Sequence, residues 1–162
     1  MQKKFTTKPQ INLTGITVRT SFDQEQGDSR IFPCVMKYFH EKLFDKIPNR
    51  ASPGTTYCAY TDYESDYKGA YTYFIGEETA APDAPLPEGF QLLTIPEQKY
   101  AVFTTTPDPM PDVLVKAWNE IWQMPEAEFG SPRRYHTDFE VYDERAADHQ
   151  NIVMDIYIGV ED

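Results

Sequence analysis

Hydrophobic and polar residues alternate along residues 11–22, which predicts a β-strand. In residues 30–45 apolar side chains recur every three or four positions, a spacing typical of an amphipathic helix. Turn and capping residues precede this helix at 27–29, and Pro48 and Asn49 follow it. The first part of the chain is therefore predicted to form a strand and then a helix.

Two short segments rich in Tyr and Thr come next, at residues 55–60 and 70–75. Because they flank a polar loop, they predict a β-hairpin. Residues 77–89 then contain three prolines among alanines and acidic residues. This composition indicates a linker between two parts of the chain.

The same order of elements recurs after the linker. Residues 90–106 contain strand-forming sequence, with a break expected near Pro96 and the stronger strand at 100–105. A helix is predicted from Pro111 to Met124, since proline is favoured at the first helical position. Two final strands are predicted at residues 137–144 and 152–160.

Each half of the chain thus has the order strand, helix, strand, strand. The two halves also end in similar sequences, FIGE around Gly76 and YIGVE around Gly159. An internal duplication of this kind predicts an α+β fold, in which the duplicated units join into one antiparallel sheet. Two main helices would lie on one side of the sheet, with a central groove between them. A single domain is expected over residues 1–162, with repeat 1 at about 11–76, a linker at 77–89 and repeat 2 at about 90–161.

The composition limits the classes of partner. The chain has 26 acidic and 15 basic residues, a formal net charge of −11, and no run of Lys or Arg. Direct nucleic-acid binding is therefore not expected, whereas a cationic ligand or a basic protein partner is favoured. No apolar run approaches the ~20 residues of a membrane span, and the first ten residues contain no signal-peptide core. We expect a cytoplasmic protein without a membrane partner.

The motifs of cofactor and metal enzymes are missing from the sequence. The three histidines and two cysteines have no metal-ligand spacing, and the cysteines do not form a disulfide framework. No Ser/His/Asp or Cys/His set, phosphate loop or dinucleotide fingerprint is present. We therefore predict no cofactor, no metal site and no assigned catalytic residue.

Glu140 is the main candidate for function. It lies within a strand pattern between Phe139 and Val141, and alternation puts Asp138 and Tyr142 on its side of the strand. This pattern fits a solvated acidic face, because charged side chains are rarely buried without a partner. It also fits a cation site, if aromatic rings cover the carboxylate.

Four aromatic residues could supply such rings. Trp118 and Trp122 are four residues apart and share one helical face, which can pack on the sheet or form a wall of the groove. Tyr71 and Tyr73 share one face of a strand, where cross-strand packing is the structural alternative to ligand contact.

Several motifs together resemble the GyrI-like (SHS2-type) small-molecule-binding family. This family includes the effector-binding domains of Rob- and BmrR-type transcription regulators. The resemblance covers about residues 11–161 and rests on four segments: KGAYTYFIGE at 68–77, LPEGFQLLTIPEQKYAVF at 86–103, AWNEIW at 117–122 and DFEVYD at 138–143.

The resemblance implies two strand-helix-strand-strand units around a groove that binds cationic, lipophilic or aromatic molecules. It assigns Glu140 as the pocket glutamate. The candidate ring residues around it are Trp118, Trp122, Tyr71, Tyr73, Tyr142 and Tyr157. The motifs begin within about ten residues of Met1, so a stand-alone sensor without a helix-turn-helix segment is expected.

The resemblance also leaves two alternatives to effector sensing. One is a hydrolase of reactive small molecules, with Glu140 as general base and Tyr142 or Tyr157 as orienting hydroxyl. The other is a protein-interaction role such as inhibition of DNA gyrase, which the negative charge permits.

Overall fold

The computed structural model describes all residues from Met1 to Asp162 and consists of one eight-stranded antiparallel sheet with helices on one face. The strand order is β1-β6-β8-β7-β3-β4-β2-β5. The strands are β1 (Gln2–Lys8), β2 (Ile11–Ser21), β3 (Thr56–Thr61), β4 (Ala70–Glu78), β5 (Gln91–Ile95), β6 (Gln98–Thr104), β7 (Thr137–Tyr142) and β8 (Asp155–Val160). This arrangement confirms the predicted α+β class.

The two halves of the chain meet at the pair β3 and β7. On one side of this pair the order is β3-β4-β2, and on the other it is β7-β8-β6, so each half contributes its strands in the same sequence. Cys58 of β3 lies opposite Glu140 of β7 in this central register. The candidate carboxylate is therefore at the junction of the halves.

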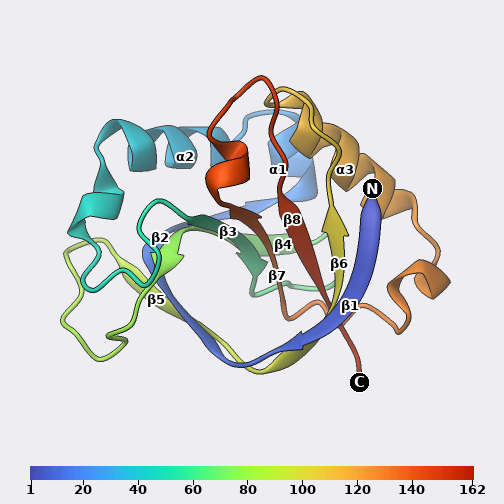
Figure 1. Cartoon of the computed structure of the whole chain (residues 1–162), viewed down its shortest axis with the longest axis horizontal. Helices are drawn as coiled ribbons and strands as arrows, with labels where there is room; N and C mark the ends of the chain where they lie inside the picture. Colours follow the sequence, from blue (N-terminus) through green and yellow to red (C-terminus); the bar gives the residue numbers. More distant parts are fainter.

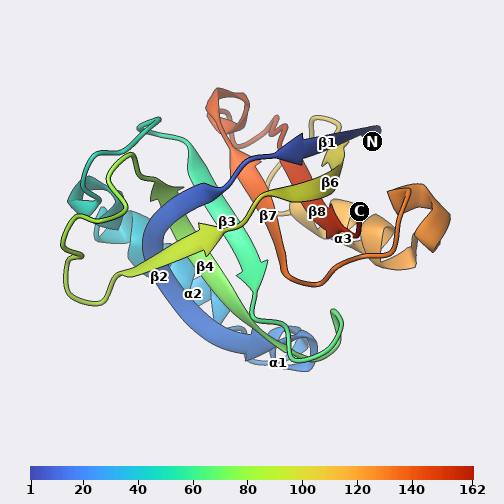
Figure 2. The ribbon, with the colours of Figure 1, turned by 90° about the horizontal axis from the view of Figure 1, so that it is seen from below.

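Each edge strand pairs with a strand of the other half and continues into a strand of its own half. Strand β1 runs into β2 past Pro9, and β5 runs into β6 past Pro96, where the break was predicted. The two long arms pair with one another in a single register, with Lys8 opposite Gln98 and Ile11 opposite Ile95. Figures 1 and 2 show the arms curving round the side of the sheet away from the helices.

Strand β1 was not predicted, because its sequence QKKFTTK gives no alternating pattern. Its single apolar side chain, Phe5, is 49% exposed. Charged residues on an edge strand are common because they oppose pairing with other chains. Such a strand has hydrogen bonds but little burial, so hydrophobic spacing does not reveal it.

Three helices lie on one face of the sheet (Figure 1). They are α1 (Phe22–Gln26), α2 (Ile31–His40) and α3 (Asp112–Gln123). The short helix α1 replaces the end of the predicted first strand. Helix α2 ends at His40 instead of Asp45, because Lys42 adopts a left-handed φ of 50° and a 3-10 turn, η1 (Leu43–Lys46), follows. None of the helices is long and apolar enough to cross a membrane.

Side chains are buried on both faces of the sheet. One core cluster lies under α3 and another under α2, whereas a third fills the opposite face, where the arms fold over. In β7, Phe139 belongs to the third cluster, and its neighbours Asp138 and Glu140 are buried on the helix side. Of the two interpretations of this strand, the solvated acidic face therefore does not hold for Asp138 and Glu140.

Candidate ligand-binding site

Glu140 is a buried carboxylate held by three neutral hydrogen-bond donors. Its side chain leaves β7 toward the helices, and the residue is 1% exposed. The hydroxyl of Tyr60 donates to Oε2 at 2.5 Å, and the indole Nε1 of Trp118 donates to the same oxygen at 2.7 Å. The hydroxyl of Tyr142 donates to Oε1 at 2.7 Å. These donors come from β3, α3 and β7, so the folded sheet and helix assemble the site.

No basic side chain pairs with Glu140. Burial raises the pKa of its carboxyl, and the hydrogen bonds from Tyr60, Tyr142 and Trp118 offset this rise only in part. The buried carboxylates elsewhere have arginines: Glu77 is 3.3 Å from Arg50, and Asp138 is 2.8 Å from Arg133. The site thus combines a desolvated acid with hydrogen bonds but no countercharge.

Aromatic rings surround this carboxylate. The ring of Tyr60 is 5.1 Å from that of Trp118 and 5.5 Å from that of Tyr73, measured between centroids. A cavity of about 30 Å³ lies among these rings. The residues lining it are Phe22, Tyr60, Tyr63, Tyr67, Tyr71, Trp118, Trp122 and Arg133.

Three rings close this cavity on the outside. Tyr67, from the loop between β3 and β4, stacks on Trp122 with 6.0 Å between centroids and an interplanar angle of 16°. Phe22, the first residue of α1, meets Trp122 edge-on at 5.0 Å. All three side chains are half-buried, whereas Trp118 beneath them is buried. The site is closed over its carboxylate.

Most of the predicted ring residues lie in this cluster. Trp118, Trp122 and Tyr71 line the cavity, and Tyr142 bonds Glu140 directly. Tyr73 packs behind Tyr60. The structure thus combines the two alternatives considered for these rings, because Trp118 and Tyr71 are core residues that also face the cavity.

Tyr157 is separate from the cluster. It pairs with Phe139 across β7 and β8 and stacks on it at 4.7 Å, on the sheet face opposite Glu140. Both faces of β8 are buried, so the sequence did not indicate which of its side chains face the helices. Tyr157 is consequently remote from the position where an orienting hydroxyl would meet Glu140, while Tyr142 occupies it.

The sequence analysis did not find five residues that line the cavity, namely Phe22, Tyr60, Tyr63, Tyr67 and Arg133. Tyr60 ends the first hairpin strand on the same face as Cys58, so strand parity could have placed it. Tyr63, Tyr67 and Arg133 lie in loops, where no periodicity shows in which direction a side chain points. Phe22 was assigned to a strand rather than to α1.

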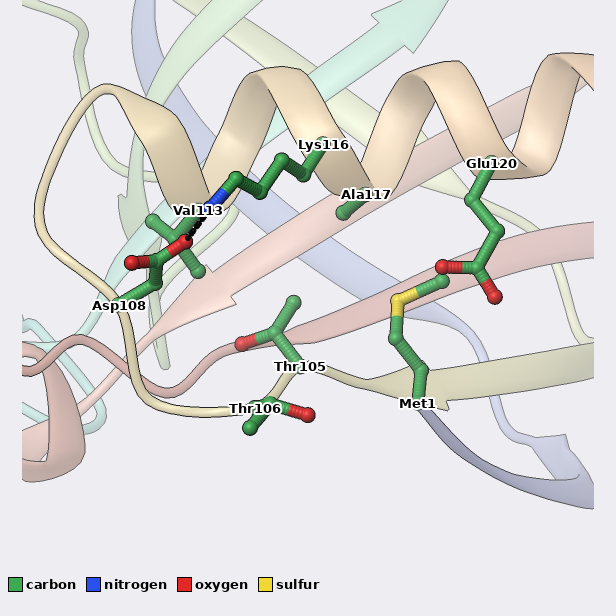
Figure 3. Close-up of a pocket in the computed structure, with 8 residues that line it drawn as sticks. All are labelled: Met1, Thr105, Thr106, Asp108, Val113, Lys116, Ala117 and Glu120. Carbon is green, nitrogen blue, oxygen red and sulfur yellow. Dashed lines mark hydrogen bonds and ion pairs between the residues drawn. The ribbon is translucent and has the colours of Figure 1, made fainter.

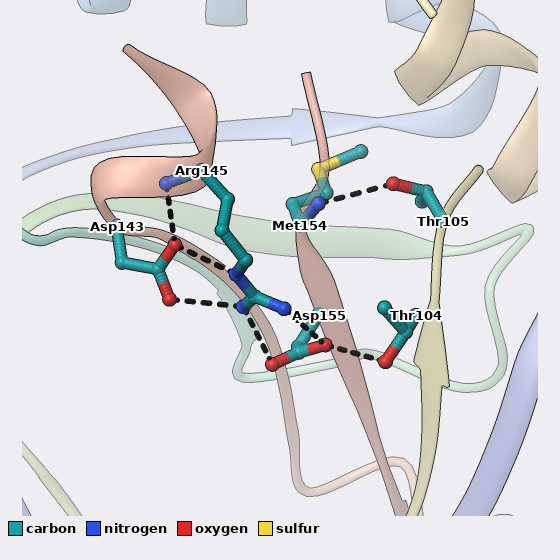
Figure 4. Close-up of polar contacts among 6 residues, drawn as sticks. All are labelled: Thr104, Thr105, Asp143, Arg145, Met154 and Asp155. Carbon is teal, nitrogen blue, oxygen red and sulfur yellow. Dashed lines mark hydrogen bonds and ion pairs between the residues drawn. The ribbon is translucent and has the colours of Figure 1, made fainter. Parts of the chain in front are cut away.

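An ion-pair cluster fixes the chain just after Tyr142 (Figure 4). Arg145 donates to Asp143 Oδ2 at 2.9 Å and to Asp155 Oδ2 at 2.8 Å, and Thr104 donates to Asp155 Oδ1 at 2.6 Å. These contacts lower the pKa of both carboxyls, against the effect of burial. The loop that leaves β7 is thereby tied to β8 and β6.

A larger hollow, of about 160 Å³, lies on another side of α3 (Figure 3). Its walls include Met1, Thr105 and Glu120 but no aromatic residue. Lys116 in its wall is already paired with Asp108 at 2.7 Å. This hollow lacks an unpaired buried charge such as Glu140. No group of three or more potential metal-ligating side chains occurs in the structure.

A duplicated antiparallel sheet with helices on one face is the fold of the GyrI-like effector-binding domains. The chain belongs to the Cass2 family, described as integron-associated effector binding proteins, because the family model matches residues 4–160. Membership of an effector-binding family makes small-molecule binding the function of this chain.

Several individual proteins are similar over nearly the whole chain. Protein YobU of Bacillus subtilis (strain 168), named as a candidate transcriptional regulator, is 28% identical over 148 residues, which are 91% of this chain and 90% of YobU. The integron cassette protein VCH_CASS2 of Vibrio cholerae is 27% identical with a TM-score of 0.75, covering 98% of this chain and 95% of its own.

Two solved structures of lower identity share the fold. SAV2435, solved bound to tetraphenylphosphonium, is 17% identical with a TM-score of 0.77, covering 99% of this chain and 94% of its own. The C-terminal domain of EcmrR is 12% identical with a TM-score of 0.65, covering 99% and 97%.

Proposed function

We propose that the protein binds lipophilic organic cations in the aromatic cluster, with the Glu140 carboxylate as their charge partner. The observation that carries this proposal is the buried carboxylate itself, which has three neutral donors and no basic neighbour. A bound cation would supply the missing countercharge in surroundings where charges interact more strongly than in water. The complex of SAV2435, a protein of the same fold, with a phosphonium cation supports this class of ligand.

The rings favour the same ligands. A cation over an aromatic face gains about 0.5–2 kcal/mol per contact, depending on its exposure. Tyr60, Trp118 and Trp122 offer such faces close to Glu140. A delocalised cation with aromatic or alkyl groups would gain both this attraction and the burial of apolar surface, whereas a small hydrated cation would gain little apolar contact.

Binding requires the cluster to open. The cavity of about 30 Å³ has room for one or two water molecules, whereas ligand pockets typically measure about 300–1,000 Å³. Phe22, Tyr67 and Trp122 form its outer side, so their separation would enlarge the cavity toward the solvent. The proposed function therefore includes a rearrangement of these three rings.

The test compares a cation with a neutral molecule of similar shape. Tetraphenylphosphonium and triphenylphosphine oxide are titrated calorimetrically into the wild type and into Glu140→Gln. We expect Glu140→Gln to weaken tetraphenylphosphonium by at least about tenfold, the scale of one charge interaction lost from a buried site, and to change the neutral compound little.

Glu144→Gln is the matched control, because Glu144 is an exposed carboxylate four residues further along the same chain segment. It removes one negative charge without touching the aromatic cluster. A loss of affinity equal in both variants would assign the effect to overall charge. An equal loss for both ligands in Glu140→Gln would also contradict the proposal.

A further inference from the structure

Arg133 is a basic residue in the wall of a cavity that we assign to cations. It lies before β7, and its side chain is 7% exposed. Its Nη2 donates to Asp138 Oδ2 at 2.8 Å, and its guanidinium lies 4.3 Å from the centroid of the Tyr135 ring. These contacts fix the guanidinium plane beside the cavity that Tyr63 and Trp118 also line.

The Nε–H of this guanidinium has no hydrogen-bond partner. Five side-chain atoms of the structure are buried without a partner, and Arg133 Nε is the only one that belongs to a residue lining this cavity. A buried donor left unpaired costs about 1–3 kcal/mol, so such atoms normally have a partner. Because Nε itself is buried, an acceptor atom on a ligand would reach it once the outer rings of the cavity separate.

We propose that Arg133 forms a second subsite, at which Nε–H donates a hydrogen bond to an uncharged acceptor oxygen of the ligand. This inference rests on the proposed cation site and adds a requirement to it. The preferred ligand is then a lipophilic cation that also has a carbonyl or ether oxygen.

The charges around Arg133 select a neutral acceptor over an anionic one. Asp138 already balances the guanidinium, so the pair has no net charge, while Glu140 adds one negative charge to the site. A carboxylate on the ligand would therefore be repelled by Glu140 without gaining a free positive partner. An ester, amide or ether oxygen takes the hydrogen bond without this repulsion.

Three dyes with one cationic ring system separate these cases. Tetramethylrosamine has the cation alone, tetramethylrhodamine methyl ester adds a carbonyl acceptor, and tetramethylrhodamine has a free carboxylate instead. We expect the wild type to bind the methyl ester about fivefold to tenfold more tightly than the rosamine, the size of one added hydrogen bond, and the free acid more weakly than the ester. This ranking needs no variant, so it does not depend on how a variant folds.

Arg133→Lys then identifies the donor. Lysine keeps a positive charge beside Asp138 but has no Nε–H in the guanidinium plane. We expect the variant to bind the ester and the rosamine about equally tightly, because it loses the hydrogen bond that distinguishes the two dyes, whatever its effect on the cation site that they share. Thermal unfolding and near-ultraviolet circular dichroism report whether the variant remains folded.

The outcomes separate the two proposals. If the wild type binds the rosamine and its methyl ester equally, or if Arg133→Lys weakens both by the same factor, the Arg133 subsite is wrong and the cation site stands. If none of the three dyes binds, or if Glu140→Gln leaves rosamine binding unchanged, the cation site itself is wrong.

Discussion

Asp138 and Glu140 leave the same face of β7 two residues apart, and only Asp138 is paired with an arginine. Asp138 also accepts hydrogen bonds from Tyr63 and from the Gly159 backbone N–H, so it belongs to a closed structural network. Glu140 accepts from three neutral donors and remains without a countercharge. Removing one partner of a buried ion pair is costly, whereas a carboxylate without such a pair is available for a ligand.

The first prediction concerns Glu140 and pH in the unliganded protein. Because burial raises the pKa of Glu140, the folded state holds a proton that the unfolded state has lost between the ordinary carboxyl pKa and the raised one. The unfolding free energy therefore decreases as pH rises through this window. Glu140→Gln removes this dependence. The unfolding free energy that the variant gains over the wild type should therefore be smallest at low pH and largest above the pKa of Glu140 in the folded state.

Thermal unfolding of the wild type and of Glu140→Gln, followed from about pH 4 to about pH 9, measures the effect. An increase of about 1 kcal/mol in the unfolding free energy corresponds to an increase in Tm of about 2–4 °C for a chain of this size. Glu144→Gln should show no such pH-dependent difference. If Glu140→Gln is less stable than the wild type at high pH, the hydrogen bonds to the Glu140 carboxylate stabilise the folded protein by more than its desolvation destabilises it.

The sequence predicted the parts of this site that lie in regular elements. Helical spacing put Trp118 and Trp122 on one face, and strand alternation put Glu140 and Tyr142 on one side. Alternation shows which residues of a strand share a side, but it does not show which side faces the helices. Tyr157 was therefore grouped with residues of the opposite sheet face.

The parts that could not be predicted depend on contacts between distant segments. Arg133 and Tyr63 are far apart in sequence and meet at Asp138 only after the two halves join. Phe22 reaches Trp122 because α1 turns toward α3, a direction that local periodicity does not report. In the same way, β1 is held by its pairing with β6 rather than by an apolar face of its own.

The second prediction concerns the hydroxyl of Tyr142, which donates to Glu140 Oε1. Tyr142→Phe removes one donor from a buried carboxylate, so the pKa of Glu140 should rise further and the folded state should lose about 1.5–3 kcal/mol at high pH. In a Glu140→Gln background the loss should be smaller, because the acceptor is no longer charged. Urea unfolding of the four proteins gives the coupling between the two residues.

Tyr57→Phe is the control for this series. Tyr57 is half-buried on the opposite face of β3 and its hydroxyl has no hydrogen-bond partner within the chain. The change should therefore have little effect on stability. If Tyr142→Phe costs the same with and without the Glu140 charge, the hydrogen bond does not depend on ionisation and the prediction fails.

The third prediction concerns the ion pair of Arg133 with Asp138. Arg133→Met leaves a buried carboxylate without its partner and should reduce the unfolding free energy by about 3–5 kcal/mol. Arg134→Met is the neighbouring control, since Arg134 approaches the exposed Asp162 at 3.6 Å, a contact of little expected value. Chemical denaturation measures the unfolding free energies of Arg133→Met and Arg134→Met. Adding Asp138→Asn to Arg133→Met should recover part of the loss, and a further decrease instead would show that the pair is not the source of the effect.

The last prediction concerns entry to the site past Phe22. The edge-on contact of Phe22 with Trp122 contributes to the closed arrangement, and aromatic pairs of this kind are worth about 0.5–1.5 kcal/mol. If binding requires the outer rings to separate, Phe22→Ala should raise the open fraction and increase the association rate of tetraphenylphosphonium by about twofold to tenfold. Stopped-flow quenching of tryptophan fluorescence follows this step directly, because Trp122 lines the cavity.

Phe32→Ala serves as the control for this measurement, since Phe32 is 65% exposed on α2 and does not line the cavity. An unchanged association rate in Phe22→Ala would mean that the ligand enters by another route, or that Tyr67 alone limits the opening.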